Sequence, residues 1–267
     1  MTPTRQFSGE QCFLGSSGVL LASLLNSTGP QAKERPELAK LRQQMRPQAH
    51  LADGIWSLEI RGFLTRNPSP WDLMMGAEDI GSAESLVAGA IRNQEVRGLL
   101  LSWDVPGSSL QGVPELADVI SKSDKPIVSW VGGHCSGGAY WCAAQSDYLV
   151  ASKSALVGGI GTFTMVVDES KAYHQAGIGI EILRNKEGDL KAIGVPGTSI
   201  DDIQRQHLME QVEASYAEFA AAVTSRRQIA PAGMRGQDLS GTQAKELGLI
   251  DSIGSERFAR TILRRLF

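Results

Sequence analysis

The sequence predicts an α/β protein with a parallel β-sheet flanked by helices. Short apolar and partly β-branched runs recur from Ile55 onward, and longer stretches with helical spacing of apolar residues separate them. Repeated strand–helix–strand units of this kind build parallel sheets, because each helix carries the chain back to the end where the next strand begins. The length of 267 residues suits one large domain of this class.

The expected elements follow one another along this domain. Strands are predicted at residues 55–60, 98–103, 126–131 and 148–151, and helices at 78–92, 113–122 and 137–145. Two further strands are predicted at 155–157 and 179–184. A long helix is expected at 200–227, with Ser199 as N-cap, and its apolar positions suit either the core or a subunit interface. The C-terminal region is expected to form helices at 240–247 and 256–266.

The first 50 residues differ in character from the rest and are predicted to be an N-terminal extension ahead of a single domain at residues 51–267. Prolines at 30, 36 and 47 lie among basic residues, with room for one short helix around 37–45. An apolar stretch at 13–25 is interrupted by serines and a glycine, which disfavours both a transmembrane helix and a secretory signal. An ordered or docking segment is the preferred interpretation, and no stable membrane insertion is expected.

The composition excludes several classes of function. A net charge of -3 and an isoelectric point near 5.9 give no electrostatic reason to expect a nucleic-acid partner. The cysteines, at 12, 135 and 142, are odd in number and lack metal-binding spacing, so neither a disulfide framework nor a zinc site is indicated. A reducing, cytoplasmic location without a cofactor is therefore expected.

The segment VGGHCSGGAYW at 131–141 joins an apolar strand to a predicted helix and places Ser136 between them. Two glycines before the serine allow the chain to turn sharply. Gly137 and Gly138 after it let a substrate carbonyl approach the backbone N–H groups at the helix start. This pattern is typical of a nucleophilic serine.

A nucleophilic serine needs a base, and its two nearest candidates are not favoured. A turn separates His134 from Ser136, so a packed structural histidine is the preferred interpretation. Cys135 points to the other side and is better explained as a buried, unreactive thiol. A lysine can serve when desolvation favours its neutral form. Lys191 follows a predicted strand among small and apolar residues, although taken alone an exposed loop lysine is the simpler interpretation.

A second strand end also carries unusual residues. The strand at 98–103 runs into DVPGSS at 104–109. In open parallel sheets ligands bind beyond the carboxyl ends of the strands, and a Pro-Gly turn there can present backbone N–H groups to a tetrahedral oxyanion. On its own, the turn is better explained as a simple connection between a strand and a helix.

Four segments lie in a specific order between residues 55 and 253: LLLSWDVPGS at 99–108, CSGGAYW at 135–141, GGIGT at 158–162 and SGTQAKELGLID at 240–251. Together they resemble the signal peptide peptidase A (protease IV) family of Ser-Lys peptidases, and within it the phage lambda-type head maturation proteases. The first looks like the family's strand ending in Asp-Ser-Pro-Gly-Gly, and the second like its nucleophile segment. The third is similar to its Gly-Ser-Ile-Gly-Val turn, and the last to its Gly-x-x-Ala-x-x-x-Gly-Leu-Ile-Asp signature.

The resemblance implies the ClpP/crotonase-like fold and a serine endopeptidase. Ser136 falls on the family's nucleophile and Lys191 on its general base, with an oxyanion hole formed by the N–H groups of Gly137 and of Gly107 or Ser108. No metal or nucleotide is implied. The substrates implied are scaffold and capsid proteins processed during phage head assembly. Family members form rings, so a homo-oligomer is expected.

Two departures from the family pattern bear on activity. Ser108 replaces the second glycine of Pro-Gly-Gly, which strains the turn if that position requires a positive φ. Gly159 replaces a hydroxyl residue that helps to orient the lysine in relatives, leaving Thr162 or Ser154 to take its place. These departures keep open an inactive structural or assembly member of the family. A cellular protease IV-type enzyme and a crotonase-type acyl-CoA enzyme are also kept open, although the latter does not explain Ser136 paired with Lys191.

Overall fold

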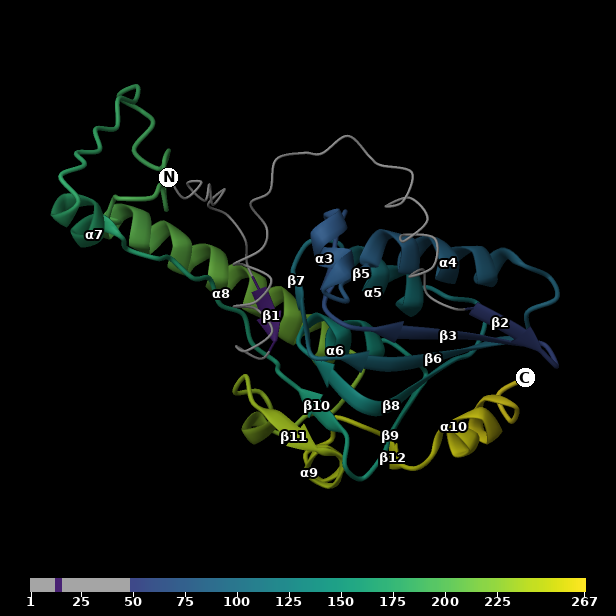
Figure 1. The fold of residues 1–267 in the computed structure, drawn as a ribbon. Coiled ribbons are helices and arrows are strands. Elements are labelled where there is room, and N and C mark those ends of the chain that lie inside the picture. Colours follow the sequence, from purple (N-terminus) through teal and green to yellow (C-terminus); the bar gives the residue numbers. More distant parts are fainter. Residues whose placement is uncertain (1–12, 16–48) are drawn as a thin grey trace.

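A mainly parallel β-sheet carries the fold, which confirms the expected α/β class (Figure 1). The computed structural model describes residues 13–15 and 49–267. The strands that pair in parallel at the centre of the sheet are β3 (Ile55–Arg61), β6 (Gly98–Val105), β8 (Ile127–Ser136), β9 (Tyr148–Ala151) and β10 (Leu156–Gly158). Antiparallel strands β2 (Ala49–Ala52) and β11 (Asp238–Ser240) lie at its edges, and β12 (Ser252–Ile253) pairs with β9.

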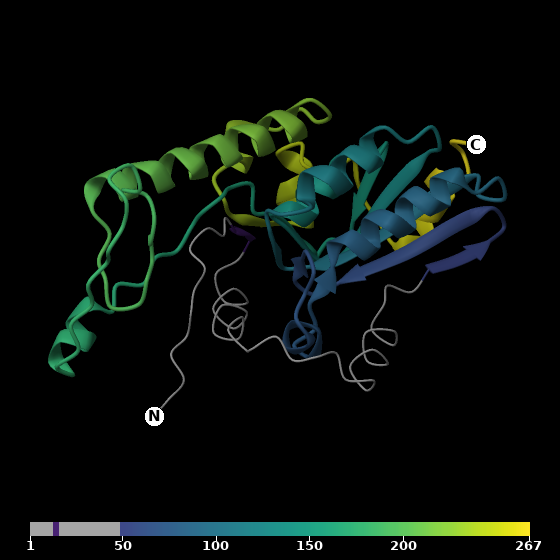
Figure 2. The same ribbon diagram turned by 90° about the horizontal axis from the view of Figure 1, so that it is seen from above.

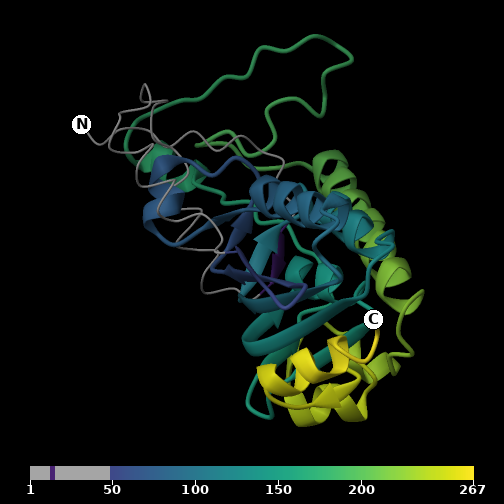
Figure 3. The ribbon, with the colours of Figure 1, turned by 90° about the vertical axis from the view of Figure 1, so that its right-hand side faces the viewer.

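Helices cover both faces of this sheet (Figure 3). One face carries α4 (Ile80–Arg92), α5 (Val113–Ser121) and α6 (Gly138–Ala143), and the other carries α10 (Glu256–Leu263). In β6, Leu99 and Leu101 belong to the core cluster beneath α4, α5 and α6, whereas Leu100 packs with residues of α10. Because both faces are covered, β6 is a continuous apolar run rather than an alternating one.

A second sheet lies beside the carboxyl end of β6. Its strands, in spatial order, are β1 (Phe13–Gly15), β7 (Gly107–Ser109), β4 (Leu64–Thr65) and β5 (Glu78–Asp79). Only Pro106 separates β6 from β7. The short helix α3 (Pro70–Met74) is capped by Ser69, whose hydroxyl accepts the N–H of Asp72. The sequence patterns predict neither these short strands nor this helix.

Residues 163–200, which we call the arm, project from the sheet beside the N-terminal part of α8 (Asp202–Thr224) (Figures 1 and 2). The arm contains the short helix α7 (Ser170–Gln175). The strand predicted at 179–184 is wrong. Apolar residues alternate there, but no described strand lies beside the segment to pair with it, and Ile180 and Leu183 stay 41% and 86% exposed.

Several element boundaries differ from the predictions for local reasons. The helix predicted at 78–92 begins at Ile80, because residues 78–79 pair as β5. Helix α8 is capped by Asp201 rather than Ser199, since the Asp201 carboxylate accepts the N–H of Gln204 at 2.8 Å in a capping box. The strand predicted at 126–131 continues to Ser136 itself. The short helix predicted around 37–45, like most of the predicted N-terminal extension, lies outside the described residues.

Packing explains the residue types of the C-terminal signature at residues 240–251. The signature contains α9 (Gly241–Glu246) and follows the 3-10 turn η1 (Pro231–Gly233). A Cβ at Gly248, or at the first residue of α9, would stand 2.1 Å from a backbone carbonyl oxygen of a neighbouring segment. Asp251 accepts the N–H of Leu149 at 2.7 Å and pairs with the buried Arg227. This signature therefore has a structural role in joining the C-terminal region to the sheet.

Candidate active site

The Ser136 hydroxyl lies where β8 ends. Gly137 follows with φ 62° and ψ -124°, a left-handed conformation that favours glycine, and α6 begins at Gly138. Ser136 is buried, and its Oγ donates a hydrogen bond to Oδ1 of Asp238 at 2.6 Å. The sharp turn between strand and helix forms directly after the serine, at Gly137, whereas Gly132 and Gly133, the glycines expected to make it, lie inside β8.

Asp238 is brought to Ser136 by strand pairing. Strand β10 pairs in parallel with β8, and it pairs antiparallel with β11 on its other side. Gly158 is the partner of Ser136 in the first ladder and of Asp238 in the second, so all three lie in one row across the sheet. The sequence analysis missed Asp238, because the two residues are far apart in the chain and become neighbours only through β10.

Gly159 explains why no hydroxyl residue stands at its position in this chain. Its φ is +59°, and a Cβ built there would lie 2.2 Å from Oγ of Ser136 and 3.2 Å from Oδ1 of Asp238. A serine side chain does not fit beside this pair in the present arrangement. The two residues expected to substitute for it do not contact Ser136: Thr162 Oγ1 donates to the carbonyl of Val212 at 2.8 Å, and Ser154 is exposed.

On the oxyanion side, β7 lies next to the Ser136 turn. Ser108 has no positive φ, since outside glycine the described residues reach that region only at Asp53, Asn67 and Ala192, so the strain expected at Ser108 is absent. The Ser108 hydroxyl is fully buried without a hydrogen-bond partner, and it occupies the space that a Cβ on Gly138 would fill.

The second predicted oxyanion donor is already engaged. The N–H of Gly137 donates to the carbonyl of Gly158 at 3.0 Å, which joins the turn after Ser136 to the end of β10. Gly137 therefore does not offer a free donor in this arrangement. Gly107, expected in a Pro-Gly turn, lies in strand β7.

The hydroxyl of Ser136 is hydrogen-bonded to Asp238 and, within the described residues, to neither of the chain neighbours His134 and Cys135. The N–H of His134 donates to Oδ1 of Asp104 at 3.0 Å, and its ring Nδ1 lies 3.8 Å from the same oxygen, at the surface. Burial raises the pKa of Cys135 well above the ordinary value of a thiol, so this residue stays protonated. Cys135 is buried, as expected. The His134 side chain is 45% exposed rather than packed, and the turn expected between His134 and Ser136 is absent because β8 runs through both residues.

Lys191 lies on the arm and is exposed. Its neighbour Asp189 accepts, through its backbone carbonyl, a hydrogen bond from Gln204 near the start of α8. The Ser136 end of the sheet contacts the same helix further along, where Trp141 of α6 stacks on Phe219 at 4.9 Å. From residue 204 to residue 219 the helix rises about 22 Å. The described chain therefore does not bring Lys191 to Ser136.

An open pocket of about 340 Å³ begins next to Gly159. It lies between the segment that follows β10, the middle of α8 and the loop before β11. Its lining residues are Gly159, Ile160, Gly161, Thr162, Phe163, Val212, Glu213, Tyr216, Met234, Arg235 and Gly236. Because Gly159 also contacts Ser136, this pocket adjoins the nucleophile.

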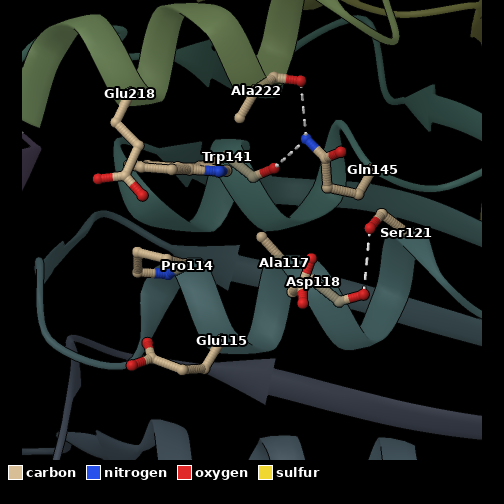
Figure 4. Close-up of a pocket in the computed structure, with 9 residues that line it drawn as sticks. All are labelled: Pro114, Glu115, Ala117, Asp118, Ser121, Trp141, Gln145, Glu218 and Ala222. Carbon is tan, nitrogen blue, oxygen red and sulfur yellow. Dashed lines mark hydrogen bonds between the residues drawn. The ribbon is translucent and has the colours of Figure 1, made fainter.

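A second open groove, of about 370 Å³, lies between α5, α6 and α8 and does not include Ser136 (Figure 4). Gln145 spans one end of it, donating to the carbonyls of Trp141 and Ala222 at 3.2 Å each. Glu115, Asp118 and Glu218 line it, yet within residues 13–15 and 49–267 no three His, Cys, Asp or Glu side chains are grouped to hold a metal ion.

In the same residues, every helix is too short or too polar to cross a membrane.

The comparison with protein families matches residues 120–266, more than half of the chain, to the model described as Peptidase family S49. The chain belongs to this peptidase family. Capsid assembly protease C of Escherichia phage lambda is 27% identical over 79% of this chain, and Protease 4 of Haemophilus influenzae is 25% identical over 61% of it. The Head-tail preconnector protein of Enterobacteria phage P21 is 24% identical over 76% of this chain.

These relatives are longer proteins. This S49 chain spans 49% of the phage lambda relative and 27% of the Haemophilus influenzae relative. Among solved structures, an enoyl-CoA hydratase from Shewanella pealeana matches 87% of this chain and 78% of its own, with a TM-score of 0.49 and 16% identity. That identity says nothing of a shared activity.

Proposed function

We propose that this chain is a serine endopeptidase in which Ser136 is the nucleophile and Lys191 the general base. The observation that carries the proposal is the turn at the end of β8, where a buried serine hydroxyl is followed by Gly137 at positive φ and by the start of α6. A strand–turn–helix of this kind is a common setting of nucleophilic serines. Membership of a peptidase family supports the same chemistry.

We propose further that the substrates are scaffold and capsid proteins, cleaved in the host cytoplasm during phage head assembly. The relatives from phages lambda and P21 match 79% and 76% of this chain, whereas Protease 4 of Haemophilus influenzae matches 61%. The longer match favours the phage role over that of a cellular signal peptide peptidase.

In the proposed reaction, Oγ of Ser136 attacks the carbonyl carbon of a peptide bond while neutral Lys191 takes the hydroxyl proton. The carbonyl oxygen becomes an oxyanion, held by backbone N–H groups of Gly107 or Ser108 and of Gly137. The C–N bond then breaks, and the amine leaves with the proton from Lys191. Water then attacks the resulting ester and gives a proton to Lys191, which passes it to Oγ of Ser136 as the ester C–O bond breaks and the carboxylic acid product leaves. The bond from the Gly137 N–H to Gly158 has to open for the first step.

Because Lys191 lies on the arm of its own chain, we propose that the dyad forms between two copies of the chain. The arm carries exposed apolar side chains, among them Ile178 and Leu183 at 50% and 86%, which suit burial against a second copy. The pocket beside Gly159 leaves room for an approaching side chain next to Ser136.

Labelling of the full chain with a fluorophosphonate tests this assignment. Ser136→Ala is expected to abolish labelling and Lys191→Ala to slow it at least a hundredfold, within the usual contribution of a general base. Lys186→Ala, which removes another exposed lysine of the arm, is the matched control and keeps the wild-type rate. Mixing the Ser136→Ala and Lys191→Ala proteins is expected to restore labelling. Equal labelling of wild type and Lys191→Ala would remove Lys191 from the mechanism.

A second candidate is a family member without catalysis that serves in assembly. The engaged N–H of Gly137 favours it, since an oxyanion donor is not free. The same labelling distinguishes the two candidates, because well-folded wild-type protein that never reacts at Ser136 supports the assembly role.

A further inference from the structure

Strand β7 carries an added strand from the distant N-terminal region of the same chain. Strand β1, Phe13–Gly15, pairs antiparallel with β7 and forms the edge of the second sheet, while β4 pairs with β7 on its other side. In the register, Phe13 lies opposite Ser109, Leu14 opposite Ser108 and Gly15 opposite Gly107. The edge of β7 is therefore able to accept an extended peptide through backbone hydrogen bonds.

This edge lies beside the nucleophile. Val105, two residues before β7, pairs with Cys135, the residue before Ser136. The Ser108 side chain fills the space beside Gly138 at the start of α6. An extended chain on β7 thus runs past the turn that presents Ser136.

The antiparallel direction determines which end of the added strand faces the nucleophile. Strand β7 starts near Cys135 at Gly107 and runs away from it toward Ser109. The added strand runs the opposite way, so it enters at Phe13 and reaches the nucleophile end at Gly15. Gly15, the smallest residue of β1, lies opposite Gly107, which is a predicted oxyanion residue. Two serines follow Gly15 in the sequence.

We infer that the edge of β7 covered by β1 binds extended peptides, and that Phe13–Gly15 occupies it as an intramolecular, substrate-like strand that competes with free peptides. The inference rests on the proposed peptidase function for its purpose. Tethering gives such a strand an effective concentration of about millimolar, enough to outcompete a dilute peptide of similar affinity.

Proline substitution in the full chain tests the competition. In a Ser136→Ala background, which makes the measurement independent of catalysis, Phe13→Pro with Leu14→Pro removes the N–H groups that pair with β7. The matched control places the same two prolines at Leu20 and Leu21, outside β1. The probe is the fluorescent peptide Glu-Gln-Ser-Phe-Leu-Gly-Ser-Ser, followed by anisotropy. The β1 variant is expected to bind it at least tenfold more tightly than the control.

A disulfide trap provides a second, independent measurement. Phe13→Cys and Ser109→Cys, in a background that also carries Cys12→Ser and Ser136→Ala, place two thiols at directly opposite positions of the antiparallel pair. The oxidised protein is expected to bind the peptide at least tenfold more weakly than the same protein after reduction.

Three results would overturn the inference: equal affinities of the β1 and control proline variants, equal affinities of the oxidised and reduced trap, or no peptide binding by any protein. Failure of the proposed function looks different. If wild type never reacts with the fluorophosphonate while the affinities change as expected, the peptide site on β7 stands and the peptidase assignment falls.

Discussion

At the level of single residues, we expect the hydrogen bond from Ser136 to Asp238 to orient the hydroxyl of the proposed nucleophile. A hydrogen bond to a charged group contributes about 1.5 to 3 kcal/mol. Asp238→Ala is therefore expected to slow fluorophosphonate labelling of Ser136 at least tenfold. Asp238→Asn keeps an acceptor oxygen at the same place, so most of the rate should return. Positioning by Asp238 is refuted if the Ala variant reacts as fast as wild type.

Ser108 offers a stability prediction, because its hydroxyl is buried without a partner. Such a group costs about 1 to 3 kcal/mol in the folded state, and alanine removes it without changing the backbone. Ser108→Ala should raise the free energy of unfolding by about 1 kcal/mol in urea titrations. Ser109→Ala is the matched control, since Ser109 Oγ bonds to Thr65 at 3.3 Å, and it should not stabilise. Stabilisation by both variants equally would contradict this account.

Single residues also show how far the sequence predicts the site. The local sequence indicates that a strand ends and a helix begins near Ser136, but the turn is made by Gly137 and not by Gly132 and Gly133, which lie in β8. Asp238 is not predictable, because its proximity depends on the pairing of β8, β10 and β11, and no residue pattern near Ser136 indicates it. Gly159 has a similar limit: the sequence shows that a hydroxyl is missing, and only the structure shows that the Ser136 and Asp238 side chains fill that space.

At the level of elements, β5 carries a buried carboxyl that makes stability depend on pH. Burial of Glu78 raises its pKa from 4.5 to about 8, with a smaller contribution from the nearby Asp79. The folded protein then holds a proton that the unfolded chain has lost between these two values, so stability falls as pH rises from about 4.5 to about 8.

Glu78→Gln should remove this dependence. Between pH 5 and pH 8.5, the free energy of unfolding of Glu78→Gln is expected to fall by a few kcal/mol less than that of wild type. Urea titrations at the two pH values measure both changes. Glu95→Gln replaces an exposed carboxyl and serves as the control, with the wild-type dependence. A Glu78→Gln protein that loses stability with pH as steeply as wild type would show that the carboxyl is ionised in the folded state.

Elements with continuous burial are predicted well, and those that depend on distant partners are not. Strands β6 and β9 match their predicted cores because apolar residues fill each of them. The segment at 179–184 has the alternation of a strand, yet a strand also needs a neighbour, which the described chain does not supply. Strand β7 shows the reverse case, since Gly-Ser-Ser has no strand pattern and pairs on both edges.

At the level of the whole molecule, the exposed apolar arm predicts self-association. Exposed apolar side chains cluster in one short segment of the arm, with Ile178 50% and Leu183 86% exposed, and a contiguous exposed apolar patch is typical of an interaction surface. Leu183→Asp should shift the protein toward monomer in light scattering coupled to gel filtration, and it should slow labelling of Ser136 if copies share the dyad. Leu51→Asp, on the exposed strand β2, is the control. An unchanged mass for Leu183→Asp would exclude this side chain from the interface.

The C-terminal signature is joined to the sheet through one buried cation. Arg227 pairs with Asp251 and also donates to the carbonyls of Ala144 and Ser146 at 3.2 and 3.0 Å, while Asp251 accepts the N–H of Leu149. The guanidinium thus links the end of α8, the segment after α6 and the residues before β12. Removing the guanidinium leaves two buried carbonyls without this donor, and it leaves Asp251, whose side chain is 34% exposed, without its charged partner.

Arg227→Ala is therefore expected to lower the free energy of unfolding by about 2 to 3 kcal/mol, and Arg227→Lys by less, since an ammonium cannot reach all three acceptors. Arg226→Ala is the matched control, because Arg226 is exposed and donates only to the carbonyl of Ser121, and about 1 kcal/mol or less is expected. Combining Arg227→Ala with Asp251→Asn should cost less than the sum of the single changes in urea titrations, since each removes the same interaction. Additive losses would mean that the two side chains stabilise the fold independently.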